Sequence, residues 1–333
     1  MRSIRSAFLV IITVSALVAC GDEPGPESSA KVTYLTSFST FGRDAYAFVA
    51  QEKGIFAEAG LDVTINPGNG TVDVLKLVAG GRAHFGIGDL TGTMITVAKE
   101  KLPVTAVAAI HQRTVAAIIG LVGGGIAGPA DLAGKRIGDP AGSTVGLMFP
   151  LYARAAGIDP GSVEFVPSAP PALPQLLVSG QVDGIGQFVV GRPLIEAAAN
   201  GRSAVVLPYG DLLPDLYGNM LVTSRELADR DPELVRRFSG ALLEALRYSI
   251  ENPEEAGRIL RKYHPTQNAE VAAAEMRLMA GYTRPDGFTG PLGAVEESRV
   301  ATVIDLLVEA RAIPDGSLRS ADIVDYDLVP GAR

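Results

Sequence analysis

The sequence predicts an α/β protein with two similarly built lobes, and three observations lead to this fold class. Segments with the two-residue period of strands alternate with helical segments along most of the chain. A chain of 333 residues with 47% hydrophobic content is too long to fold around one simple hydrophobic core, so two domains are expected. One pattern also occurs twice, at 77–90 (LVAGGRAHFGIGDL) and 176–188 (LLVSGQVDGIGQF). In both copies an apolar helix end reaches a glycine suited to positive φ, and a short apolar strand with a polar end follows.

The first twenty residues have the features of a bacterial lipoprotein signal. Two arginines precede the apolar run AFLVIITVSALVA, and the following Leu17-Val18-Ala19-Cys20 resembles a lipobox, in which Cys20 would be acylated. An ordinary secretory signal or a membrane helix is the alternative, but the run is shorter than the roughly 20 residues that span a bilayer. Residues 21–30 are rich in Gly, Pro, Ser and acids and predict a flexible tether after the 1–20 signal.

Charge and cysteine content exclude several kinds of partner. The formal net charge is -8, and cleavage before Cys20 would remove two arginines and no acids, which gives -8 - 2 = -10. Such a charge argues against nucleic acid or an anionic membrane surface as a partner, so any membrane contact is expected through the lipid anchor alone. Cys20 is the only cysteine, and no histidine has a metal-ligand partner at helical spacing. We therefore expect neither disulfides nor a metal site.

The first lobe shows strand and helix patterns in alternation, which predicts a mainly parallel sheet. Strands are expected at 31–36, 61–65, 83–88 and 103–110, and helices from about Ala45, over 72–79 and over 93–101.

The second lobe is expected over 115–219. Its first strand is the apolar run 115–122, and GNMLVTS (218–224) is expected as the strand that returns to the first lobe. Lobe one then comprises 31–114 and 220–333. Between these points we expect strands at 135–138, 163–166, 182–186 and 203–208, and helices from Ser143, over 170–180 and near 193–199.

Residues after Asp231 are predicted to be mostly helical. Apolar residues recur every four positions from Leu234 to Ile250, which indicates an amphipathic helix. Asn252 and Pro253 have the types that suit an N-cap and a first helical position, so a new helix is expected there. A loop is expected at 283–293.

Six segments, in this order and spacing, resemble the branch of periplasmic substrate-binding proteins related to the thiamine-pyrimidine synthases. The segments are FVAQEKGIFAEAGLDV, LKLVAGGRAHFGI, PADLAGKRIGDPAGS, LLVSGQVDGI, NMLVTS and ENPEEA. The resemblance spans roughly residues 32–265 and implies a type II periplasmic-binding-protein fold, with two α/β lobes joined by two hinge strands. This family contains the solute receptors of nitrate, sulfonate, taurine and thiamine-precursor ABC importers. Such receptors are commonly lipid-anchored in Gram-positive bacteria, which fits the lipobox.

Candidate site residues follow from the rule that ligands bind beyond the C-terminal ends of strands in open α/β sheets. The turn GDPAGST places the N–H groups of Ser143 and Thr144 at a helix start, where a phosphate, sulfonate or carboxylate could bind. Alternatively, Ser143 only caps its own helix; the family's usual use of this loop favours the ligand. Arg113 offers a planar fork to an anion, or else is solvated or paired with Asp89 or Asp139.

The remaining candidates supply donors, acceptors and aromatic rings. Asp89 would favour an amine or another donor on the ligand. Phe38, Phe41 and Phe188 could hold a flat ring of the ligand, unless they belong to the core. His111, Tyr217 and Asp139 also lie near strand ends. The candidate ligand-binding residues are Ser37, Phe38, Ser39, Thr40, Phe41, Asp89, Leu90, Thr91, Gln112, Arg113, Ser143, Thr144, Gln187, Phe188 and Asn219.

The expected function is that of an extracytoplasmic, lipid-anchored receptor of an ABC importer. The receptor, expected to be a monomer, would bind a small solute between its lobes by hinge closure. The solute is expected to be anionic, with a (hetero)aromatic one also allowed. The receptor would then deliver it to a permease driven by a separate ATPase. No catalytic residue and no cofactor are expected. Neither 86–88 nor 184–186 carries the third glycine of a dinucleotide fingerprint.

Two other classes share the fold. A thiamine-pyrimidine precursor synthase is the enzyme alternative, and that family consumes its own histidine and a lysine-bound pyridoxal phosphate. Its Cys-rich segment is absent here, and no histidine lies in the first βα loop. The effector domain of a transcription regulator would need DNA-binding helices, whereas residues 1–30 are predicted to be signal and tether.

Overall fold

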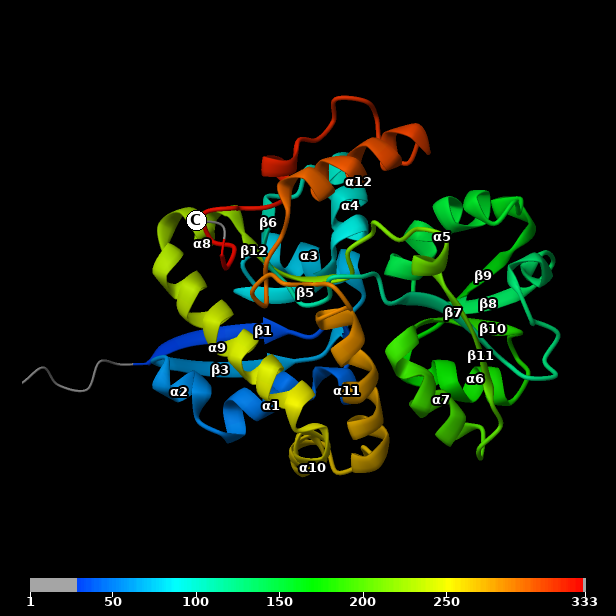
Figure 1. The fold of residues 1–333 in the computed structure, drawn as a ribbon, viewed down its shortest axis with the longest axis horizontal. Coiled ribbons are helices and arrows are strands. Elements are labelled where there is room, and N and C mark those ends of the chain that lie inside the picture. The colour runs from blue at the N-terminus through cyan, green and yellow to red at the C-terminus, as the bar shows by residue number, and fades with distance from the viewer. Residues whose placement is uncertain (1–28, 332–333) are drawn as a thin grey trace, which may run out of the picture.

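The computed structural model describes residues 29–331, which form two α/β lobes side by side (Figure 1). Each lobe is built around a five-stranded sheet. The predicted signal, with the predicted lipidation site Cys20, and most of the predicted tether lie outside the described residues. Within 29–331 no helix combines the length and the apolar character needed to cross a membrane.

The sheet of lobe one has the strand order β3-β1-β5-β12-β6. Its strands are β1 (Ala30–Leu35), β3 (Leu61–Asn66), β5 (Phe85–Asp89), β6 (Val104–Ala109) and β12 (Asn219–Ser224). The helices between them are α1 (Ala45–Glu52), α2 (Ile55–Glu58), α3 (Thr71–Ala79) and α4 (Leu90–Glu100). A ribbon of β2 (Phe38–Ser39) and β4 (Gly68–Asn69) joins the chain after β1 to the chain after β3.

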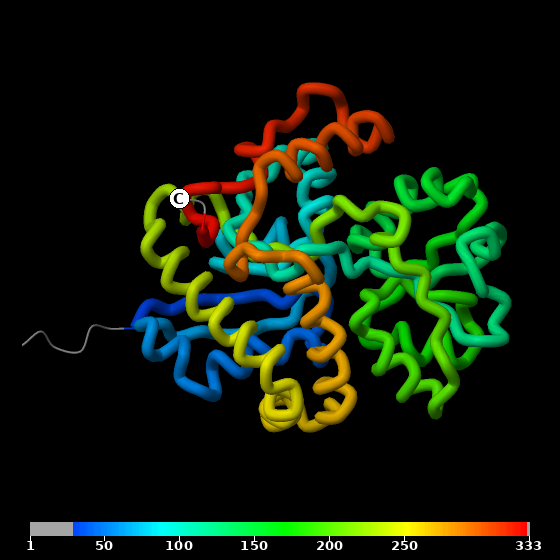
Figure 2. Tube along the Cα trace, viewed as in Figure 1, coloured from blue at the N-terminus to red at the C-terminus, as the bar shows by residue number. Residues whose placement is uncertain are grey.

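The sheet of lobe two has the order β11-β7-β10-β8-β9. Its strands are β7 (Ala116–Leu121), β8 (Arg136–Asp139), β9 (Glu164–Pro167), β10 (Gly184–Phe188) and β11 (Ala204–Pro208), and its helices are α5 (Thr144–Ala155), α6 (Leu173–Val178) and α7 (Arg192–Ala198). The chain passes between the lobes twice, after β6 and after β11 (Figure 2). The lobe boundaries at 114/115 and 219/220 remain predictions.

Both sheets are mixed but mainly parallel, as predicted, because four of the five described strands in each sheet run in one direction and a single strand runs the other way. β12 runs antiparallel to β5 and β6, and β7 runs antiparallel to β10 and β11. Each of these strands is the first one after a passage between lobes. A helical crossover between two neighbouring strands of one sheet makes them parallel. No such crossover connects β7 or β12 to the strand before it in the chain, because that strand lies in the other sheet.

The chain after β12 returns to lobe one, as Figures 1 and 2 show. It forms α8 (Arg225–Arg230), α9 (Pro232–Glu251), α10 (Pro253–Tyr263), α11 (Ala269–Thr283) and α12 (Glu297–Glu309). α9 and α10 pack on α1, whereas α11 also contacts α7 of lobe two. Asn252 precedes α10 but makes no side-chain N-cap bond, which corrects the prediction. Its amide donates to the Tyr248 carbonyl at the end of α9 (2.9 Å).

The core of lobe one centres on Phe238 of α9, one of the apolar residues that recur every four positions. Its ring is fully buried and stacks on Phe85 of β5 (centroids 4.1 Å apart, planes at 6°) and on Phe56 of α2 (5.5 Å, 8°). One side chain therefore joins the sheet to two helices, and the packing of α9 depends on it.

We predict that Phe238→Ala lowers the free energy of unfolding by about 3–5 kcal/mol, because it leaves a large cavity against two rings. Urea unfolding measures the change. Leu278→Ala on α11 is the control, since Leu278 is 37% exposed and should shift the midpoint little. Equal losses in the two variants would contradict the central role of Phe238.

Candidate functional site

A small cavity lies between the lobes, with residues of both in its wall. Its volume is about 10 Å³, which is room for about one water molecule. The lining residues are Ser37, Phe38, Gly70, Thr71, Asp139, Ser143, Thr144, Val145, Gly186, Gln187 and Phe188.

Direct contacts hold the two lobes closed around this cavity. The hydroxyls of Thr71 at the start of α3 and Thr144 at the start of α5 are 2.9 Å apart. The rings of Phe38 in lobe one and Phe188 in lobe two lie with their centroids 5.9 Å apart. The structure is therefore the closed form of the two-lobed molecule.

The start of α5, where the sequence suggested an anion site, is capped by the protein's own side chains. Ser143 is the N-cap, and its Oγ accepts the Gly146 N–H (3.0 Å). Asp139, at the end of β8, accepts the same N–H through Oδ2 (3.1 Å) and also accepts the Ser143 hydroxyl. Ser143 thus caps its own helix, and a carboxylate of the chain interacts with the helix dipole, while a ligand contact at Ser143 and Thr144 stays a prediction.

The other oxygen of Asp139 faces the cavity without a hydrogen-bond partner in the described part of the chain. It stands over Gly186 of β10, where an added Cβ would lie 2.1 Å from Oδ1, so only glycine leaves room for the carboxyl. Burial raises the pKa of Asp139 to about 7. An unpartnered, buried carboxyl oxygen costs free energy that a ligand donor would recover.

Lobe one presents a second carboxyl close to the cavity. Asp89 ends β5 and caps α4, because its Oδ1 accepts the Gly92 N–H (3.0 Å) while Oδ2 has no partner within residues 29–331. Burial raises its pKa to about 7. Asn219, opposite Asp89 on β12, donates to Ser37 Oγ (3.4 Å), and its own Oδ1 is likewise unpartnered.

Arg43 is a buried residue of the site that the sequence analysis left out. Only 2% exposed, it places its guanidinium against the rings of Phe41 (4.8 Å), Phe188 (4.7 Å) and Phe38 (5.7 Å). It donates to Gln187 Oε1 across the lobes (3.4 Å) and to the Phe38 carbonyl (3.3 Å). The three phenylalanines, referred to below as the aromatic cage, therefore surround a planar cation.

The charge of Arg43 is balanced by acids on its own side of the molecule. Glu275 of α11 accepts the Arg43 backbone N–H (3.0 Å), and Gly42 permits this close packing, since its Cβ would lie 2.5 Å from the Ala272 backbone. Burial raises the pKa of Glu275 to about 7 and that of Asp44 to about 6, although Arg43 opposes both shifts. Burial and the nearby Arg43 lower the pKa of His111 to about 3, which keeps this histidine neutral.

The structure separates the predicted site residues into three groups. Six line the cavity: Ser37, Phe38, Ser143, Thr144, Gln187 and Phe188. Phe41, Asp89 and Asn219 contact these or adjoin them. The others do not line it: Ser39, Thr40, Leu90, Thr91, Gln112 and Arg113.

The residues outside the cavity have other surroundings. Leu90 and Thr91 are buried within lobe one, and the Thr40 carbonyl accepts from Gln267 (3.0 Å). Gln112 and Arg113 instead border an outer hollow, where Gln112 donates to the Ala294 carbonyl (2.8 Å) and Arg113 is exposed.

Gly70, Thr71 and Gly186 line the cavity although they were absent from the predicted set. Thr71 follows β3 and the short β4, so the rule of residues beyond strand ends would have found it. Nothing in the local sequence shows that Arg43 would turn inward.

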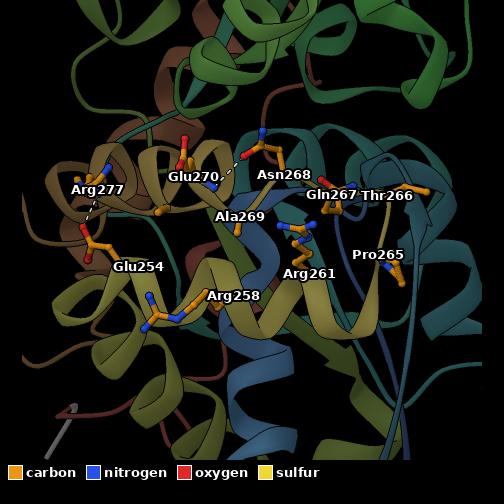
Figure 3. Close-up of a pocket in the computed structure, with 11 residues that line it drawn as sticks. Glu254, Arg258, Arg261, Pro265, Thr266, Gln267, Asn268, Ala269, Glu270 and Arg277 are labelled. Carbon is orange, nitrogen blue, oxygen red and sulfur yellow. Dashed lines mark hydrogen bonds and ion pairs between the residues drawn. The ribbon is translucent and has the colours of Figure 1, made fainter.

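A wider hollow of about 870 Å³ lies between α10 and α11 of lobe one (Figure 3). It is lined mainly by exposed side chains, some of them paired with one another, such as Arg277 with Glu254. Arg258 and Arg261 reach into it from α10. It receives no residue from lobe two and no buried, unpartnered polar group, so the cavity between the lobes is the better candidate. Among the described residues, no cluster of His, Cys, Asp and Glu could hold a metal ion.

Two α/β lobes with two connecting passages and a cavity between them define a type II periplasmic-binding-protein fold. Solved structures agree with this class. The alkanesulfonate-binding protein SsuA from Xanthomonas axonopodis pv. citri superposes with a TM-score of 0.67 at 18% identity, over 88% of this chain and 98% of that one. The periplasmic nitrate-binding protein NrtA from Synechocystis PCC 6803 gives 0.69 at 16%, over 91% and 87%. At these identities the likeness shows the fold and not the solute.

The chain belongs to the NMT1/THI5-like family, whose model matches residues 44–256, more than half of the protein. A formylaminopyrimidine-binding protein of Halalkalibacterium halodurans is 24% identical over 265 residues, 78% of this chain and 79% of the relative. A 4-amino-5-hydroxymethyl-2-methylpyrimidine phosphate synthase of Saccharomyces cerevisiae is 26% identical over 266 residues, 77% of each. The family thus includes proteins named for binding and proteins named for synthesis.

We predict that Gly186→Ala displaces the Asp139 carboxyl and lowers the free energy of unfolding by about 1–3 kcal/mol, because the new methyl group overlaps Oδ1. The control is Gly240→Ala in α9, where an added Cβ meets nothing within 4 Å and a better helix former replaces glycine. Thermal unfolding of both variants checks the prediction. A Gly186→Ala protein as stable as Gly240→Ala would contradict it.

We also predict that the solute-free protein loses stability between about pH 5 and pH 8. Asp89 and Asp139 titrate near 7 when folded, against about 3.9 when unfolded, so the folded state binds more protons in this interval. By linkage, the free energy of unfolding falls as the pH rises through it.

Urea unfolding at a series of pH values measures this slope. Asp89→Asn and Asp139→Asn should flatten it, whereas Asp305→Asn, which changes an exposed carboxyl on α12, should leave it unchanged. A stability that is level or rises from pH 5 to pH 8 in the wild-type protein would contradict the prediction.

Proposed function

We propose that this protein is the extracytoplasmic solute receptor of an ABC importer, which closes its two lobes on a small solute and presents it to a permease driven by an ATPase. The observation that carries the proposal is the cavity between the lobes, which residues of both lobes line and where Asp139 and Gln187 have buried polar atoms without a partner among the described residues.

These unpartnered groups supply a physical reason for ligand-dependent closure. Asp139 Oδ1 and Gln187 Nε2 in lobe two, and Asp89 Oδ2 in lobe one, have no partner among the described residues of the closed form. Each buried, unsatisfied group costs about 1–3 kcal/mol, which opening to water would relieve. A solute that bonds to both lobes removes that cost only in the closed state, so it shifts the equilibrium towards closure.

Structural neighbours support the same function. SsuA and NrtA are named as binding proteins, and a related structure from Staphylococcus aureus is named the ligand-binding component of an ABC-type import system. A permease partner, a lipid anchor at Cys20 and a monomeric receptor all belong to this proposal.

The enzyme alternative is supported by the likeness to the yeast synthase. The cavity fits its chemistry poorly. No lysine and no histidine lines the described wall, so a pyridoxal phosphate would find no amine there, and no imidazole is placed for consumption. His111 lies nearby but is buried. These residues favour binding over catalysis.

Mass spectrometry of small molecules released from the purified protein tests the proposed function. We predict a co-purifying solute whose addition to stripped protein makes the molecule more compact in small-angle scattering. The absence of both a retained solute and any compaction with candidate solutes would contradict the receptor function.

Two matched variants locate the site of binding. Arg43→Met should weaken binding of that solute at least about tenfold, because Arg43 shapes the aromatic cage and contacts Gln187. Arg113→Met, which changes an exposed arginine outside the cavity, should weaken it far less. The reverse order in calorimetric titrations would favour the sequence-based choice of Arg113.

A further inference from the structure

We propose that closure of the two lobes is coupled to the binding of a proton by three buried residues, Arg43, Asp44 and Glu275, referred to below as the Arg43 cluster. Acidic conditions then favour the closed form, and alkaline conditions favour the open form. The inference goes beyond the proposed receptor function and shares with it only the movement of the lobes.

The Arg43 cluster lies where lobe one meets lobe two. Arg43 and Asp44 belong to η1 (Gly42–Asp44), and Glu275 lies on α11. Both elements contact η5 (Val189–Gly191) of lobe two, and α11 also contacts α7. Separation of the lobes removes η5 and α7 from this face and admits water. The burial of the two acids therefore depends on closure.

In the closed form the cluster holds two carboxyl groups but one cation. Arg43 is 2% exposed, Asp44 is 3% exposed and Glu275 is fully buried. Within residues 29–331 the Arg43 guanidinium donates to Gln187 and to the Phe38 carbonyl and not to either acid. With both acids ionised, the cluster thus has an excess negative charge out of reach of water. Buried charge without a direct partner is costly, and binding of a proton removes that cost.

The hydrogen bonds of the two acids indicate where the proton binds. Asp44 Oδ2 accepts the Phe41 N–H (2.9 Å), and Glu275 Oε2 accepts the Arg43 N–H (3.0 Å). Glu275 Oε1 has no partner in the described part of the chain, so a proton there breaks neither of these bonds. Burial raises the pKa of Glu275 to about 7 and that of Asp44 to about 6, against the opposing charge of Arg43. Glu275 is therefore the first to bind a proton as the pH falls.

The other titratable groups that face the Arg43 cluster stay neutral. Tyr34 of β1 and Tyr46 of α1 have their hydroxyls 3.2 Å apart, and burial raises the pKa of both phenols. His111 follows β6, and burial together with the nearby cation lowers its pKa to about 3. None of these three side chains supplies a charge between pH 5 and pH 8, so the balance depends on the cluster itself.

Linkage gives the direction of the coupling. In the open form water reaches Glu275, which then titrates near its ordinary pKa of 4.5, whereas burial raises its pKa to about 7 in the closed form. Between these values the closed form binds more protons, so the ratio of closed to open molecules rises as the pH falls. We expect a rise of at least about tenfold from pH 8 to pH 5.5, since each displaced pKa unit changes an equilibrium tenfold.

Small-angle scattering of the solute-free protein at pH 8 and pH 5.5 tests the inference, because the closed form is more compact than the open one. We expect a smaller radius of gyration at pH 5.5, with far-ultraviolet circular dichroism confirming the fold at both pH values. A wild-type protein that is equally compact at both, or more extended at pH 5.5, would overturn the inference.

Glu275→Gln assigns the effect to this acid, because glutamine keeps an oxygen for the Arg43 N–H and carries no charge. At pH 8 its ratio of closed to open molecules should exceed that of the wild type at least about tenfold. Glu270→Gln is the matched control, since it changes an exposed acid of the same helix and should behave as the wild type does. Asp89 and Asp139 keep their own titration in both variants. A folded Glu275→Gln protein as extended as the wild type at pH 8 would overturn the assignment.

Asp44→Asn is a second variant, should Glu275→Gln fail to fold. Asparagine keeps an acceptor for the Phe41 N–H and leaves one acid to balance Arg43. This variant should likewise be more compact than the wild type at pH 8, and it should change less on acidification. An unchanged response to pH in folded Asp44→Asn would overturn the inference.

Addition of the co-purifying solute at pH 8 separates this inference from the proposed function. Compaction with solute, but none on acidification or in the variants, leaves the receptor function standing and overturns the inference. Compaction on acidification without any effect of solute supports the inference and contradicts the receptor function. Absence of compaction under every condition overturns both, because both require the lobes to move.

Discussion

The cleft depends on one constraint, which is that buried polar atoms need partners. Asp139 shows it most clearly: one carboxyl oxygen is held by the start of α5, and the other faces the cavity over a glycine that leaves it room. In the open form water would satisfy the second oxygen. In the closed form the cavity has room for about one water molecule, so a ligand that donates to this oxygen would favour closure under the proposed function.

The same residue pattern caps a helix in each lobe. Asp89 and Asp139 stand at corresponding places in the two lobes, each at the end of a strand and each bonded to the first turn of the following helix. Capping fixes the orientation of the carboxyl and engages one N–H group of the first turn in each lobe, Gly92 in lobe one and Gly146 in lobe two. The repeated architecture thus leaves one carboxyl oxygen in each lobe without a partner among the described residues.

Arg43 adds a buried cation to the cleft. The aromatic cage surrounds its guanidinium, and Glu275 and Asp44 lie near it on the lobe-one side. One cation, three rings and two acids thus form one buried group that joins η1 (Gly42–Asp44), α11 and lobe two. The family relationship covers binding proteins and synthases alike. The described wall of the cavity includes neither lysine nor histidine, which supports the proposed receptor over a synthase.

The sequence by itself determined the order of strands and helices, the two-lobed α/β class and the strand-end positions where polar residues gather, because these depend on local periodicity and on turn residues. It could place Ser143 at a helix start but could not decide between a cap and a ligand contact. The antiparallel pairing of β7 and β12, the inward turn of Arg43 and the outward position of Arg113 were decided only by the tertiary structure. These features depend on which segments meet across the lobes, and no local pattern encodes that long-range packing.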